Sequence, residues 1–346
     1  MTLLLTGSDE TVHGILGAMR YVTTAGATRP FEGPSADMII ALARTFDSAR
    51  TDLSVGDRII DADGGWSMGD LALSELCSAL PDARARHEAM VASTLCVLMA
   101  DELDPAGEEA LDELAHSFGV DEEAADVIQS ITQSSATVAG GDLFRRFLAE
   151  RSDESLDVIT ERLERLEAPV STPPEEFDAY NRQLQAAPEG SVGAELLRFY
   201  QHTGYDIPGN PAVPLLPALS LLGNHDLHHV LAGYSTSGSD EVNVAAFTAA
   251  NSADGGIYYL AVVLMQWHHS VKVSPFEPAH STLDPEMLAT ALARGATSTF
   301  DVSDRSWEWK SVIGENLEEV RGELGITPGG TVGIGGAWDA RGSGNA

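Results

Sequence analysis

Hydrophobic residues recur every three to four positions along most of the chain, which is the spacing of an amphipathic α-helix. The alternating pattern of strands is scarce throughout. In the first part of the chain, the spacing predicts helices over residues 36–48, 67–80, 85–100, 106–118 and 121–134. Short turns with Gly, Pro or Asp separate these segments, and such residues start and stop helices. We therefore expect an all-α protein.

A second series of helical segments begins near residue 185, after a stretch that Pro169, Pro173 and Pro174 interrupt. The chain from residue 328 onward is rich in glycine. Helices are expected over 194–205, around His225, around Glu241, near 257–269, and over 284–295 and 314–325. The expected organisation is a helical domain over 1–140, a charged proline-containing connector over 141–184, a second helical domain over 185–327 and a disordered tail over 328–346.

Composition and charge narrow the classes of partner. The chain has 346 residues, 43% of them hydrophobic, which is enough for two packed domains. A net charge of −33 repels phosphate backbones, so nucleic acid is excluded and membrane contact is at most peripheral. Its apolar runs fall short of the roughly 20 residues that cross a bilayer. No basic leader is present, and Cys77 and Cys96 fit free thiols in a reducing cytosol, so we expect a cytoplasmic protein.

Acidic turns stand between the N-terminal helices. One contains Asp61 and Asp63, and another runs from Asp101 to Pro105. Trp66 occupies the position where a calcium loop of this kind requires glycine, so helix caps and a solvated acidic face are favoured over a cation site. The arrangement over roughly 30–135 resembles the TerB-like (tellurite-resistance) helical domain. That resemblance implies a stress-response module that senses an ion or a partner.

One segment of the second half gathers several good metal ligands. His225 and His229 are one turn apart on a helix, and Asp226 borders the same face. Glu241 follows His229 after eleven residues, and the Gly-Ser-rich stretch 233–239 can turn the chain to bring it back. Two imidazoles with one or two carboxylates suit Zn²⁺, although a redox-active metal is not excluded. The competing interpretation is that the two histidines cap a helix or lie at the edge of the core.

The stretch 185–327 resembles the coenzyme Q biosynthesis protein 4 family. The segments that carry the resemblance are Pro188-Glu-Gly-Ser-Val-Gly193, the ligands His225, Asp226, His229 and Glu241, Gly233-Tyr234, Arg294-Gly295, Trp307 with Trp309, and 316–326. The resemblance implies a helical fold with a motif-bound divalent metal and a lipid-like ligand beside it. It also implies a role in ubiquinone biosynthesis, as an organiser of other enzymes and as an oxidative decarboxylase. This chain differs by its added N-terminal domain.

The first functional hypothesis is therefore a metal-dependent step in the synthesis of ubiquinone or a related prenylated aromatic compound. Asp226 is the candidate catalytic base if it is not itself the fourth ligand. The second hypothesis is a non-catalytic scaffold that gathers biosynthetic enzymes around a structural metal. The segment 257–267 has more apolar residues than one buried helix face needs. Some of them can therefore line a prenyl-chain groove or the interface of a homodimer.

Overall fold

The computed structural model describes residues 7–100, 104–119, 172–213, 219–252, 256–272, 280–299 and 307–338, and the single residues 155, 157 and 301. This described part contains twelve α-helices and no strand, which confirms the all-α prediction. Isolated bridges join Ile60 to Trp66 and Ser191 to Asn316. The predicted helix over 121–134 lies outside the described residues. None of the described helices is long and apolar enough to cross a membrane.

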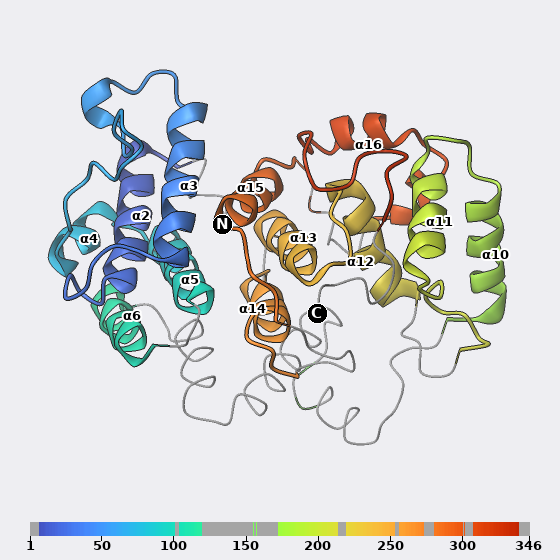
Figure 1. The fold of residues 1–346 in the computed structure, drawn as a ribbon, viewed down its shortest axis with the longest axis horizontal. Coiled ribbons are helices and arrows are strands. Elements are labelled where there is room, and N and C mark those ends of the chain that lie inside the picture. The colour runs from blue at the N-terminus through green and yellow to red at the C-terminus, as the bar shows by residue number, and fades with distance from the viewer. Residues whose placement is uncertain are drawn as a thin grey trace.

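Five helices form the N-terminal half, at the left of Figure 1: α2 (Asp9–Thr23), α3 (Pro34–Ala49), α4 (Leu73–Ala79), α5 (Ala83–Met99) and α6 (Pro105–Phe118). Helix α2 contacts the other four and forms the centre of this bundle. The side chains of Asp82 and Asp104 accept backbone N–H groups at the starts of α5 and α6. These two acidic residues of the N-terminal turns therefore act as helix caps.

The loop before α4 differs from the sequence prediction, which placed a helix over 67–80. Residues 67–72 are not helical, because the Ser67 N–H donates to the Ile59 carbonyl beside the Ile60–Trp66 bridge. A short 3₁₀ turn, η1 (Val55–Asp57), precedes this loop. Helix α4 begins at Leu73, and the Glu75 side chain accepts the Ala72 N–H at its start. Backbone pairing across the turn between Ile60 and Trp66 has overridden the helical pattern there.

Seven helices and one 3₁₀ turn form the C-terminal half. They are α10 (Pro174–Gln185), α11 (Val192–Thr203), α12 (Leu219–Ala232), α13 (Gly238–Asn251), α14 (Gly256–Trp267), α15 (Pro285–Ala296), η2 (Trp309–Val312) and α16 (Leu317–Glu323). Helix α13 contacts α12, α14 and α15, and α10 packs on α11 at the far right of Figure 1. Because three helices contact α13, the first turn of α13 has a fixed position in this half.

Helix α10 lies within the stretch that was expected to be a connector. Pro174 stands in its first turn, where the missing N–H costs nothing. Tyr180 and Leu184 of α10 are buried in the same core as α11. The prolines therefore mark the start of a helix here, and the C-terminal half begins earlier than residue 185.

The prediction of a disordered tail from residue 328 is wrong for residues 328–338. Val332 and Trp338 are buried there, and the segment lies against the end of α12. Gly330 has φ +94°, and a Cβ atom at this position would lie 2.3 Å from the Gly233 carbonyl oxygen. Glycine is thus required for close backbone contact, and it does not signal disorder here. Residues 339–346 lie outside the described part.

The two halves share one apolar core. Helix α3 packs against α15, and α5 packs against α14. Arg44 of α3 bonds to Glu286 of α15 at 3.0 Å, and the His269 side chain lies 2.9 Å from the Leu98 carbonyl. These contacts join the described helices of the two halves.

Candidate metal centre

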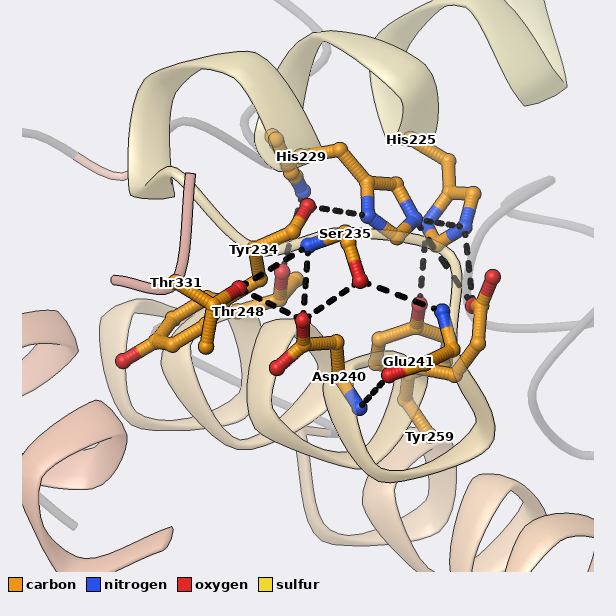
Figure 2. Close-up of polar contacts among 11 residues, drawn as sticks. His225, His229, Tyr234, Ser235, Asp240, Glu241, Thr248, Tyr259 and Thr331 are labelled. Atoms are coloured by element: carbon orange, nitrogen blue, oxygen red, sulfur yellow. Dashed lines mark hydrogen bonds and ion pairs between the residues drawn. The ribbon is translucent and has the colours of Figure 1, made fainter. Parts of the chain in front are cut away.

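Helices α12 and α13 run consecutively and present three ligand side chains to one point. His225 and His229 lie one turn apart on α12, and Glu241 lies in the first turn of α13. The Ser237 hydroxyl accepts the Asp240 N–H and fixes the start of α13. The short loop between the helices folds Glu241 back beside the histidines (Figure 2).

The donor atoms are spaced as a single cation requires. The two imidazole Nε2 atoms are 3.2 Å apart, and each lies 3.7 Å from Glu241 Oε2. Among the described residues, these three side chains form the group of possible metal ligands whose donor atoms lie within 4.8 Å of one another. Two Zn–N bonds of about 2.0–2.1 Å at the tetrahedral angle put the nitrogens about 3.3 Å apart. The observed spacing fits that ion.

The outer nitrogens of both imidazoles are held by other groups. His229 Nδ1 lies 3.0 Å from the Tyr234 carbonyl, which can only accept, so this nitrogen carries the proton. Tyr259 holds His225 Nδ1 at 3.0 Å through its hydroxyl. Such partners orient metal-binding histidines and leave the Nε2 lone pair for the ion. When the Tyr259 hydroxyl accepts from His225 Nδ1, both Nε2 atoms present lone pairs 3.2 Å apart, and a proton or a metal ion between them is then favoured.

Burial differs across the group. The His229 side chain is 1% exposed and stacks on Phe199, with ring centroids 5.5 Å apart. Glu241 is 14% exposed and His225 is 24% exposed. The centre is therefore closed on the His229 side, and solvent reaches it on the His225 side.

The charges in the group reinforce one another. Burial alone would raise the pKa of Glu241, but the neighbouring imidazoles hold that pKa well below its usual range. Burial opposes a charge on His229, yet Glu241 and Asp226 raise the pKa of His229 above its ordinary value. These side chains therefore stabilise positive charge among them, as a cation site must.

Asp226 was expected as the fourth ligand or as a base beside the metal, and it lies outside the three-atom group. Its Oδ2 accepts the Tyr200 hydroxyl at 2.9 Å. Desolvation by burial is the main cause that raises the pKa of Asp226, to about 6. A carboxylate with that pKa next to a ligand can take up and release a proton near neutral pH.

Two nearby histidines lie elsewhere. His228 follows the ligand face of α12 by about 100°, and its Nδ1 lies 3.0 Å from the Thr248 hydroxyl. His268 at the end of α14 lies near the Ser281 carbonyl instead. Sequence reasoning missed the roles of Tyr200 and Tyr259. Their only signal was a hydroxyl within an otherwise apolar helical pattern.

Two glycines of the segments that suggested a family have a packing role. A Cβ atom on Gly193 would lie 2.8 Å from the Ile313 carbonyl oxygen, and one on Gly295 would lie 2.1 Å from the Phe247 carbonyl oxygen. Neither contact touches the metal ligands. These positions therefore explain the fold of the C-terminal half and leave the chemistry to the residues on α12 and α13.

No protein-family model matches this chain, and no curated protein matches it either. The case for function therefore depends on the chemistry of His225, His229 and Glu241, together with the resemblance that the sequence carries.

Proposed function

We propose that this protein binds one divalent cation, most simply Zn²⁺, through His225, His229 and Glu241. The observation that carries the proposal is the convergence of two Nε2 atoms and one carboxylate oxygen, with both outer nitrogens held by other groups. Two imidazoles and a carboxylate also suit Fe²⁺ in oxygen-using enzymes, so the ligand set allows a redox-active metal.

We further propose that the cation serves the synthesis of ubiquinone or a related prenylated aromatic compound. The support is the resemblance of residues 185–327 and the exposure of His225, which gives a ligand access to the centre. Three protein ligands leave a position for a carboxylate or phenolate oxygen of an aromatic acid. A bound cation would polarise that oxygen as a Lewis acid. Asp226, whose charge acts on the pKa of His229, is proposed as the base.

The runner-up function is a scaffold in which the cation is structural. It is favoured by the burial of His229, which shields one side of the centre from solvent. In that case the protein would gather biosynthetic enzymes or bind a prenylated lipid without changing it.

Metal content tests the site. Native mass spectrometry of the purified protein should show one bound metal ion, and it reports co-purified lipid and subunit number in the same experiment. His225→Ala and His229→Ala should each lose the metal. The matched control is His228→Gln on the same helix, which should retain it. Retention of metal by both alanine variants would contradict the assignment.

Cobalt substitution separates the enzyme from the scaffold. If one ligand position is open, a phenolic acid should change the visible absorption of the Co²⁺ protein, and a prenylated acid should do so at lower concentration. An unchanged spectrum at millimolar acid would indicate a closed coordination sphere. The scaffold would then be the better account.

A further inference from the structure

We infer that the glycine-rich C-terminal strap, residues 328–338, is part of the metal centre. Thr331 and Asp240 act as positioning residues that hold the loop which orients His229. The inference rests on the proposed metal-binding function. It adds to the metal centre a segment that lies about a hundred positions after His229 in the sequence. No ligand atom of the cation comes from the strap.

Backbone and side-chain contacts anchor the strap along its length. Thr331 and Val332 both donate their backbone N–H to the Gly233 carbonyl, at 2.7 and 2.8 Å. Further along, the Arg198 guanidinium donates to the carbonyls of Gly335 and Gly336. The Val332 side chain is buried. The strap is therefore held in one place on the molecule.

The far end of the strap reaches the aromatic wall of the metal centre. The Trp338 N–H donates to His202 Nδ1 at 3.2 Å. Its buried indole packs edge-on against Phe199, with centroids 5.3 Å apart. Phe199 is the ring on which His229 stacks. Trp338 is thus separated from this ligand by one aromatic ring.

Asp240 joins the strap to the loop between α12 and α13. Its Oδ2 accepts the Thr331 hydroxyl at 2.5 Å, the Ser235 hydroxyl at 2.6 Å and the Ser235 N–H at 3.0 Å. Its Oδ1 accepts the Asn243 side-chain N–H at 3.2 Å. Asp240 is buried and immediately precedes Glu241. Figure 2 shows this carboxylate between Thr331 and Ser235, below the histidine pair.

The loop carries the acceptor that orients His229. The Tyr234 carbonyl binds His229 Nδ1, and it lies between two residues that the strap controls. Gly233 on one side accepts two strap N–H groups, and Ser235 on the other side is bound to the Asp240–Thr331 pair. With both neighbours held, the Tyr234 carbonyl keeps one direction and His229 keeps one tautomer. Partners of this kind are worth about 10- to 100-fold in metal affinity.

Thr331→Val tests the inference, because it removes the hydroxyl and keeps the shape of the side chain. Zinc affinity, measured by competition with a chelator, should fall about 10-fold or more. Thr331→Ser restores the hydroxyl and should bind zinc like the parent protein. Thr299→Val makes the same change at a surface position and should have no effect. If Thr331→Val unfolds, Ser235→Ala removes the other hydroxyl bonded to Asp240 and should lower affinity in the same way.

A second measurement reads the orientation of His229 without metal. Above pH 8, nitrogen NMR of the metal-free parent should show the proton of His229 on Nδ1, and Thr331→Val should show a mixture of tautomers. Unchanged tautomer and unchanged zinc affinity in Thr331→Val would overturn the inference while leaving the metal site in place. A parent protein that binds no metal, but whose tautomer still depends on Thr331, would overturn the proposed function and the role of the strap in metal binding.

Discussion

The contact between α13 and α15 makes a sharp prediction for Gly295→Ala. The added methyl group would lie 2.1 Å from the Phe247 carbonyl oxygen, 3.0 Å from its carbon and 3.1 Å from the Ala250 Cβ. Ordinary contacts of a methyl carbon are about 3.5–4.0 Å, so the two helices must move apart by about 1 Å. A helix backbone cannot yield as the end of a flexible side chain can. The strain should therefore fall on the helix pair that carries Glu241.

The net effect follows from two opposing contributions. Overpacking of this kind costs about 1–3 kcal/mol, and alanine in place of a helical glycine returns up to about 1 kcal/mol. We expect Gly295→Ala to lower the free energy of unfolding by about 1–2 kcal/mol. Gly322→Ala is the matched control, because Gly322 lies in α16 with no atom within 4 Å of an added Cβ. That variant should gain about 0.5–1 kcal/mol.

Urea unfolding followed by circular dichroism measures both variants against the parent protein. A shift of the midpoint at constant slope reports a change in stability. The two variants should move in opposite directions. Equal or greater stability of Gly295→Ala would refute the packing argument, and it would mean that α15 can shift away from α13 without loss.

Three other predictions concern the same helices. Arg294→Met should lower the free energy of unfolding by about 2–4 kcal/mol in the same urea assay. The reason is that the buried guanidinium donates to the carbonyls of Ala232 and Thr327. A loss below about 0.5 kcal/mol would contradict this. Zinc affinity, measured by calorimetry, should rise as the pH passes through the raised pKa of His229, because the metal must displace the proton of the imidazolium. A zinc affinity that stays constant from pH 6 to 8 would be inconsistent with His229 as a ligand. In thermal unfolding, zinc at about 100 times its dissociation constant should stabilise the parent protein by about 2.7 kcal/mol. A chelator, or the substitution Glu241→Gln, should remove most of this gain. An equal gain in Glu241→Gln would exclude Glu241 as a ligand.

The sequence predicted the helices best where local chemistry decides their ends. The segment predicted over 85–100 is α5 at Ala83–Met99, and Asp82 caps its start. The segment predicted over 106–118 is α6, with Asp104 as its cap. The helix predicted over 67–80 was too long, because the Ser67 N–H pairs with the Ile59 carbonyl beside the Ile60–Trp66 bridge, and the spacing of apolar residues does not reveal this pairing. Proline near 174 suggested a break, although a first-turn proline is compatible with a helix.

The sequence named His225, His229 and Glu241, which the structure brings together, but it also named Asp226, which lies outside that group, and it did not indicate the residues that support them. Helical spacing aligned His225 with His229, and the loop before α13 returned Glu241 to them. Tyr234 contributes a main-chain carbonyl, which any residue possesses, so no residue type revealed it. The contact of Thr331 with Asp240 joins residues 91 positions apart. Glycine-rich sequence fits both a loose tail and a backbone pressed against another, and only the fold distinguishes the two.

The packing of α15 between α13 and α3 has a consequence for dissecting the protein. A fragment that starts after residue 172 would present to water the side of α15 that α3 covers in the intact chain. Such a fragment should self-associate, and its metal content would then report on aggregates. Replacing only the first hundred residues with those of another protein would expose the same side of α15, so the N-terminal helices and the helices of the candidate metal centre should be kept together.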